Sequence, residues 1–250
     1  MLQTEPSIML PAQPNRSLMD GVRCLQILST NPGPLGAREL ARRLNMETTR
    51  AHRLLKTLAH MGMARQNRNA KYMPGPAMHV LAAQSLYSSG LIGNTTKPLL
   101  ELHRKVNLIT AFGMLWERNV YYLYHLMPGM SAEDAVGRLR LQPATQSGIG
   151  MMLLSKRSDE KAREFFDGVN EIPGYLGGVE MVIEDLHRIR KAGHAFVKVN
   201  SDTAEVSLSA MSSNNLYMGV AVAGSFDESR IPELKSAIDE ALEKMFPEAP

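Results

Sequence analysis

The residues best suited to chemistry in this sequence are cationic and hydroxyl side chains on one face of a predicted helix. Arg50, Arg53 and Lys56 follow Thr48 and Thr49 at spacings that keep them away from the apolar side of that helix. A guanidinium group can clasp a phosphate or bond both acceptors of a guanine edge, and hydroxyl groups bond phosphates or bases near a helix start. The pattern therefore indicates binding to nucleic acid.

Two helices and a tight turn are needed to position this face. Apolar residues recur at helical spacing from Leu40 to Leu44, the period breaks at 45–48, and a second apolar stripe runs from Ala51 to Leu58. The spacing predicts a helix-turn-helix whose second helix has the width to enter a major groove.

A predicted wing follows the second helix. Residues 63–73 contain two short strand-like pieces around a turn at 67–69, and Pro74-Gly75-Pro76 ends the unit. The wing tip is basic and suited to phosphates or a minor groove. Helices and wing together predict these DNA-contacting residues: Arg38, Thr48, Thr49, Arg50, His52, Arg53, Lys56, Arg68, Asn69 and Lys71.

Charge is strongly segregated along the chain. Residues 16–71 hold 11 Lys and Arg against 3 Asp and Glu, whereas the remainder is net acidic, so the total of +3 conceals a cationic module. Such a module attracts polyanions by releasing their counterions. The alternative is that the basic residues merely solvate a small helical domain.

Composition limits the remaining possibilities. At 250 residues with 44% hydrophobic content, the chain suits one small and one medium domain, and its single cysteine rules out an internal disulfide framework. We expect Cys24 to be a core residue of a first helix over 17–29. We find no secretory signal or membrane span, so we expect a cytoplasmic protein with a flexible tail at 1–15.

The pattern after the wing is mixed. Residues 77–87 strongly favour a helix, which we expect to join the two domains. This helix packs either against the same helix of a second copy in a dimer or within its own chain. Helices and strands then alternate in groups, which predicts an α+β domain with a curved antiparallel sheet. The strands are expected at 108–116, 120–127, 194–199, 205–212 and 216–223, and the helices at 95–105, 146–155, 159–167, 179–192 and 231–245.

Catalytic, metal and cofactor sites are not predicted. The histidines show no ligand-like spacing with one another or with Cys24, and Ser147-Gly148 lacks the surroundings of a nucleophile elbow. The methionines are interpreted as adaptable core filler, and Trp116 as a core residue at a strand end. We therefore do not expect an enzyme.

The chain from about Arg16 to Met245 resembles the IclR family of bacterial transcriptional regulators. Three regions carry the resemblance in the family's order and spacing. They are the head, with Glu39-Leu-Ala-Arg-Arg-Leu-Asn and Thr49-Arg-Ala-His-Arg-Leu-Leu-Lys-Thr-Leu; the segment Pro143-Ala-Thr-Gln-Ser-Gly-Ile-Gly150; and Ile189-Arg-Lys-Ala-Gly-His-Ala-Phe196.

The resemblance implies a winged helix-turn-helix at 16–75, a linker helix at 76–92 and a GAF-like effector-binding domain at 93–250. It also implies a double-stranded DNA operator, a small organic effector, and assembly as a homodimer or dimer of dimers. Carried over position by position, the effector site would comprise Gly148, Ile149, Val197, Glu205, Ser207, Ala221 and Ala223.

The sequence departs from the family pattern in that site. Val197 stands where the family often has an acidic residue, Ala221 and Ala223 where it has hydroxyls, and Met151 where it has lysine. We expect a less polar pocket that favours an effector with an apolar or aromatic body, with Ser207 and backbone amides as anchors. Glu205 then points away, is protonated, or meets an amine or hydroxyl of the ligand.

Three functions are compatible with these features. The first is a ligand-responsive transcription factor, for which the resemblance implies repression as the commoner mode. The second is a metabolic α+β enzyme with an accessory nucleic-acid module, which would need a convergent acid–base or nucleophile set that the sequence does not display. The third is a nucleoid-type binder, which the size of the second domain disfavours.

Overall fold

The structure is a computed structural model that describes residues 12–131, 136–198, 205–212 and 217–247. The chain divides into two compact units between Leu91 and Ile92. Most of the predicted tail at 1–15 lies outside the described residues. Asn15 is described, and its side chain caps the first helix by accepting a hydrogen bond from the Leu18 N–H at 3.0 Å.

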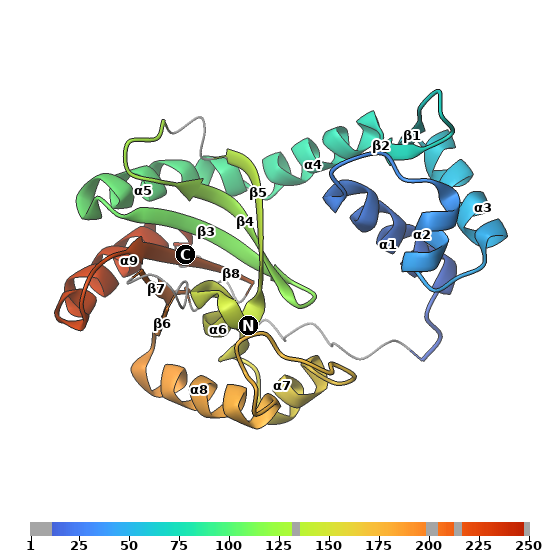
Figure 1. Ribbon diagram of the computed structural model, residues 1–250. Coiled ribbons are helices and arrows are strands. Elements are labelled where there is room, and N and C mark those ends of the chain that lie inside the picture. Colours follow the sequence, from blue (N-terminus) through green and yellow to red (C-terminus); the bar gives the residue numbers. More distant parts are fainter. Residues whose placement is uncertain (1–11, 132–135, 199–204, 213–216, 248–250) are drawn as a thin grey trace. The chain divides into compact units, whose positions relative to one another are not determined.

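The first unit is a helical head with a two-stranded wing (Figure 1). Its core is built around Cys24, Leu40, Leu55 and Tyr72, each at most 2% exposed, so the expected burial of Cys24 is confirmed. Its elements are α1 (Arg16–Thr30), α2 (Ala37–Arg43), α3 (Thr48–His60), β1 (Ala64–Gln66), β2 (Tyr72–Pro74) and α4 (Pro76–Ser88).

The second unit contains a larger sheet and the remaining helices. The strands pair in the order β5-β4-β3-β8-β7-β6, and every neighbouring pair is antiparallel. Its elements are α5 (Leu91–Val106), β3 (Ile109–Trp116), β4 (Asn119–Leu126), β5 (Val136–Pro143), α6 (Gly148–Leu154), α7 (Asp159–Phe165), α8 (Val179–Ala192), β6 (Ala195–Lys198), β7 (Val206–Ala210), β8 (Met218–Gly224) and α9 (Ile231–Met245).

Helices cover both faces of this curved sheet. In Figure 1, α5 and α9 lie on one side of it, and α6, α7 and α8 lie on the other. Ile149 of α6 is fully buried against the sheet, and Phe112 of β3 contacts Phe246 beyond α9 with ring centroids 6.3 Å apart. The predicted α+β class with a curved antiparallel sheet is confirmed.

Two details differ from the sequence-based expectation. Strand β5 is not predicted, because its segment contains Gly137 and ends at Pro143, two residue types that weaken a strand, and pairing with β4 is what holds it at the sheet edge. Trp116 is not a core residue. It is 46% exposed at the β3–β4 hairpin, where it contacts the ring of Tyr121, because an edge-proximal hairpin end is not covered by a helix.

Candidate nucleic-acid interface and effector pocket

Helix α3 separates an apolar face from a cationic face. Ala51, Leu55 and Leu58 are buried in the head, which is the period expected of an amphipathic helix. The side chains predicted to bind DNA from this helix are all exposed: Thr48, Thr49, Arg50, His52, Arg53 and Lys56. Their availability for a groove follows directly from the packing of the opposite face.

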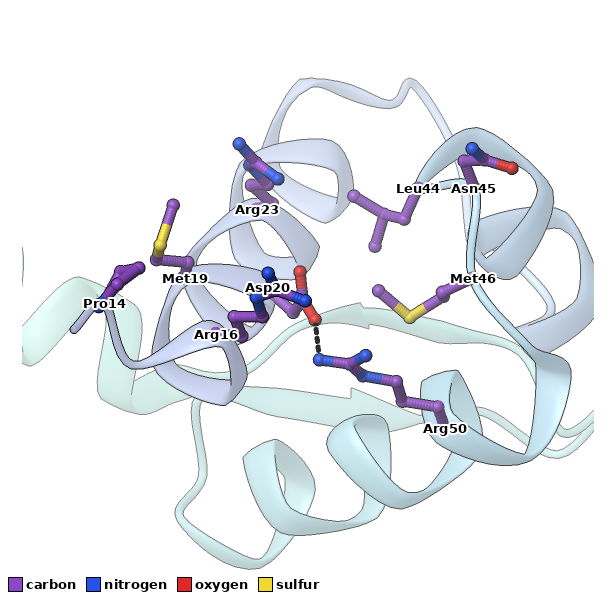
Figure 2. A pocket seen from close by; sticks show the side chains of 9 residues that line it. All are labelled: Pro14, Arg16, Met19, Asp20, Arg23, Leu44, Asn45, Met46 and Arg50. Carbon is purple, nitrogen blue, oxygen red and sulfur yellow. Dashed lines mark ion pairs between the residues drawn. The ribbon is translucent and has the colours of Figure 1, made fainter. Parts of the chain in front are cut away.

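Arg50 is exposed but not unpaired. Its Nη2 lies 2.5 Å from Oδ2 of Asp20 in α1, and the side chains are 46% and 16% exposed respectively. Figure 2 shows this ion pair in the middle of a cavity of about 310 Å³. The cavity lies between α1, the α2–α3 turn and the start of α3, and it is lined by Pro14, Arg16, Met19, Asp20, Arg23, Leu44, Asn45, Met46 and Arg50.

Helix α2 adds further cations beside α3. Arg38 is exposed in the first turn of this helix, while Arg42 and Arg43 both form ion pairs with Glu39. Hydrogen bonds from Arg42 and then from Arg43 lower the pKa of Glu39 to about 2. Glu39 therefore stays ionised at any physiological pH and neutralises part of the charge of this helix.

The wing is a true hairpin held by backbone geometry. Oδ1 of Asn67 accepts hydrogen bonds from the N–H groups of Asn69 and Lys71, both at 3.0 Å, and this turn leaves Arg68, Asn69 and Lys71 exposed at the tip. The base of the wing is anchored by paired backbone hydrogen bonds between Leu35 and Tyr72. The predicted wing residues are thus presented together on the head.

The second unit contains a pocket between the sheet and the start of α6. Its volume is about 60 Å³. Six of the seven residues expected to contact an effector line it, namely Gly148, Val197, Glu205, Ser207, Ala221 and Ala223. The rest of the lining is Ile109, Ala111, Tyr122, His125, Gln142, Gln146 and Ser147.

Ile149 is not in this lining, contrary to the expectation. The residue is a fully buried part of α6 and packs in a cluster with Ala111, Leu153 and Ala221. A Cβ atom added at Gly113 would lie 3.6 Å from the Ile149 side chain, and one added at Gly219 would lie 3.0 Å from it. The two glycines make room for Ile149 in the core, so the side chain that follows Gly148 turns away from the pocket.

The pocket is more polar than the sequence predicts. The expectation counted Ser207 and backbone amides, but the neighbouring strands β4 and β5 add Tyr122, His125 and Gln142. The Tyr122 hydroxyl donates to Oε1 of Gln142 at 2.8 Å. These residues were missed because they come from strands that no motif marks, and only the sheet order brings them to Ser207.

Two further expectations can be placed. Glu205 is exposed at the pocket, so its carboxylate keeps contact with water there. Gly148 allows a close approach, because a Cβ there would lie 2.4 Å from Oγ of Ser209 and 3.0 Å from Oγ of Ser207. The floor of the pocket is therefore shaped by small residues on both α6 and β7.

We also searched the described residues for metal-binding clusters and for membrane-spanning helices. Within them, no three His, Cys, Asp or Glu side chains gather as a metal site would require. Among the described helices, none combines the length and the apolar character needed to span a bilayer.

Comparisons with known proteins address the head and the whole fold separately. Residues 17–68 match the family model of the IclR helix-turn-helix domain. None of the curated proteins compared matches this sequence. The match to the family model covers α1 to α3 and the start of the wing, which is the part of the chain that carries the cationic face.

Solved structures share the fold at low sequence identity. An IclR family transcriptional regulator from Brucella abortus aligns with a TM-score of 0.76 and 14% identity, covering 94% of this chain and 92% of that one. An IclR homologue from Microbacterium hydrocarbonoxydans complexed with 4-hydroxybenzoate aligns with a TM-score of 0.67 and 17% identity, covering 92% of this chain and 98% of that one. The Agobacterium tumefaciens repressor BlcR aligns with a TM-score of 0.54 and 18% identity, covering 93% of this chain and 98% of that one.

The two findings agree on one family. The domain match concerns the residues that build the basic helix and its supports, and the structural likeness extends through the second unit. Residues 17–68 of this chain therefore match the IclR helix-turn-helix domain, and the chain shares the fold of solved IclR-family transcriptional regulators over more than nine-tenths of its length.

Proposed function

We propose that this protein is a transcriptional repressor that binds a double-stranded operator through its head and is controlled by a small organic effector bound in the second unit. The observation that carries the proposal is the match to the IclR helix-turn-helix, whose α3 exposes all six of the predicted DNA-contacting side chains that it carries. An exposed basic helix of this kind binds phosphates and reads base edges in the major groove.

A homodimer fits this proposal best. Helix α4 has no buried residue within its own chain, and Val80, Leu81 and Tyr87 are 55%, 52% and 90% exposed. Covering such apolar surface with the same helix of a second copy would remove it from water. Two heads joined in this way would read a two-fold operator.

The effector proposed is an organic molecule with an aromatic or aliphatic body and a few polar groups. Ala111, Val197 and Ala221 offer apolar surface in the pocket, and His125, Gln142 and Gln146 offer polar groups. The Microbacterium homologue complexed with 4-hydroxybenzoate supports this class. The exposed Glu205 disfavours a ligand carboxylate beside it and favours a hydroxyl or amine there.

Effector binding must enlarge the pocket. Small-molecule sites usually have volumes of ~300 Å³ or more, whereas this cavity is about 60 Å³. A ligand larger than a few waters therefore selects a more open arrangement of α6 and the sheet. A ligand that binds two arrangements with different affinities shifts their populations, which is the physical requirement for control of a distant head.

The match to the IclR helix-turn-helix domain favours a transcriptional regulator over a metabolic enzyme with an accessory nucleic-acid module. The test is a titration of labelled duplex DNA from the neighbourhood of the gene with the purified full chain, at several salt concentrations. We expect tight binding that weakens as the salt concentration rises. We also expect 4-hydroxybenzoate, or a related acid from a small panel of organic acids, to release the protein from the DNA. Absence of duplex binding at every salt concentration would refute the proposal, and tighter binding with effector would refute repression by release.

A further inference from the structure

We propose that Asp20 is a specificity-determining residue that restrains Arg50 and thereby penalises binding to arbitrary DNA. The inference rests on the proposed function, because it concerns how the head distinguishes an operator from other duplexes. It begins with the ion pair between Asp20 of α1 and Arg50 of α3, whose Oδ2 and Nη2 are 2.5 Å apart (Figure 2).

The position of the pair gives it significance for DNA. Arg50 lies in the first turn of α3, directly after Thr48 and Thr49, and the first turn of a recognition helix is the part that contacts base edges. Asp20 lies in the second turn of α1 and reaches Arg50 across the cavity drawn in Figure 2. The carboxylate is thus attached to the supporting helix while its partner is on the reading helix.

Apart from Asp20, the charged residues that line the cavity are cationic. Of the nine described residues that line the cavity, three are the arginines Arg16, Arg23 and Arg50, and one is Asp20. A phosphate would be attracted to the three cations, and Asp20 opposes it. An interface built for affinity alone would omit this negative charge.

The carboxylate controls where the guanidinium can go. An Arg side chain has five N–H donors, and the ion pair places Nη2 against the Asp20 carboxylate, which limits the positions that the guanidinium can take. The other donors stay available for a base edge that lies within reach of those positions. Reaching a phosphate in a different direction requires Arg50 to leave Asp20, which costs the pair before the new contact is made.

Matched and unmatched DNA therefore meet different penalties. On an operator whose base faces the restrained guanidinium, Arg50 binds without reorganising and with its side-chain entropy already lost. On arbitrary DNA only phosphate contacts remain, and those compete with Asp20. The restraint lowers affinity for wrong sequences more than for the right one, which is how a repulsive element creates specificity.

The test compares two duplexes and four proteins. One duplex is enriched from a random-sequence library by the full-length wild type, and the other is a scrambled duplex of the same composition. Their affinities are measured by fluorescence anisotropy over a salt series for the wild type, Asp20→Asn, Arg50→Ala and the double variant. Such a cycle isolates the part of the Asp20 effect that acts through Arg50.

We expect Asp20→Asn to raise affinity for the scrambled duplex several-fold and to steepen its salt dependence by about one counterion, because Arg50 gains a phosphate contact. Affinity for the enriched duplex should stay unchanged or fall, so the ratio of the two affinities drops by about tenfold, which is the size of one good base contact. In the Arg50→Ala background, Asp20→Asn should leave this ratio unchanged.

Glu47→Gln is the matched control. Glu47 is exposed just before α3, so its substitution removes the same charge near the same helix without touching the Asp20–Arg50 pair. It should raise both affinities by a similar factor and leave their ratio unaltered.

Several outcomes would overturn the inference. Equal gains on both duplexes for Asp20→Asn, as for the control, would reduce Asp20 to a general electrostatic effect. Unchanged affinities with a lower melting temperature would make the pair purely structural, and an effect that persists without Arg50 would place it elsewhere. If Asp20→Asn does not fold, Arg50→Gln, which removes the cation that Asp20 restrains, must lose the discrimination. Failure of the wild type to enrich any duplex would overturn the proposed function and this inference together.

Discussion

The hydroxyl of Tyr122 lies 2.9 Å from Oγ of Ser147, and this contact joins the sheet to the start of α6 at the pocket. Tyr122 donates its proton to Oε1 of Gln142, so Ser147 is the donor in the contact between the two hydroxyls. Oγ of Ser147 in turn accepts the N–H of Gly150 at 3.3 Å. The result is a continuous chain of hydrogen bonds, in which each bond polarises the next.

Removing the Tyr122 hydroxyl should break this chain. We expect Tyr122→Phe to lower the free energy of unfolding by about 1–2 kcal/mol, because Ser147 and Gln142 each lose a partner in a half-buried site. Urea unfolding monitored by circular dichroism would measure this, and operator affinity should be unchanged. Tyr121→Phe, at the neighbouring position of β4, is the control. A response to effector identical to that of the wild type would argue that the network does not form part of the ligand site.

Arg53 tests the direct DNA contact without the complication of an ion pair to Asp20. It is exposed on α3 among the predicted contacts. We expect Arg53→Ala to weaken operator binding by about 1–3 kcal/mol if it reads a base, or to reduce affinity uniformly and flatten the salt dependence by about one counterion if it binds a phosphate. Anisotropy titration distinguishes the two. Operator affinity equal to that of the wild type would contradict the docking of α3 proposed above.

Gly75 is the position in the head where a side chain is least tolerable. A Cβ there would lie 2.2 Å from the carbonyl oxygen of Gly62 and 2.8 Å from backbone atoms of Ala64, neither of which can rotate away. We expect Gly75→Ala to lower the melting temperature by several degrees through distortion of the wing. Gly21→Ala is the matched control, because a Cβ inside α1 meets nothing within 4 Å. That variant should be neutral or more stable.

Cys24 should be unreactive in the folded protein. Burial, with a smaller contribution from the charge of Asp20, raises the pKa of its thiol from 9.0 to about 11. We expect a thiol reagent at pH 8 to label the native chain far more slowly than the chain in denaturant. Because the folded pKa is raised, this group's contribution to stability is present below about pH 9 and is lost as pH rises through about 11. Rapid native labelling would contradict the packing of α1.

Acid should act on the ion pairs between α5 and α9. Hydrogen bonds from Lys105 and then Lys244 lower the pKa of Glu240 from 4.5 to about 2. A lowered folded pKa gives stability above about pH 4.5 that is lost as pH falls through about 2. We therefore expect Glu240→Gln to flatten the pH dependence of urea unfolding in that window. Glu243→Gln, an exposed change on the same helix, should leave the wild-type dependence intact.

The sequence by itself determined the elements whose periods are local. Apolar spacing predicts α3 and the wing, and the order of motifs predicts an IclR-type head followed by an α+β domain, as confirmed by the family model and the fold. Amphipathic period and turn residues depend on neighbours along the chain, so one sequence suffices to find them.

Tertiary structure alone decided which side chains meet across elements. The pairing of Asp20 with Arg50, the polar lining added by Tyr122 and Gln142, and the inward turn of Ile149 depend on contacts between segments distant in the chain. Helix packing sets the neighbours of Asp20 and Ile149, and strand order and register set those of Tyr122 and Gln142. A one-residue change in register would send these strand side chains to the other face of the sheet. No local period carries that information, which is why the exposed Trp116 was expected in the core.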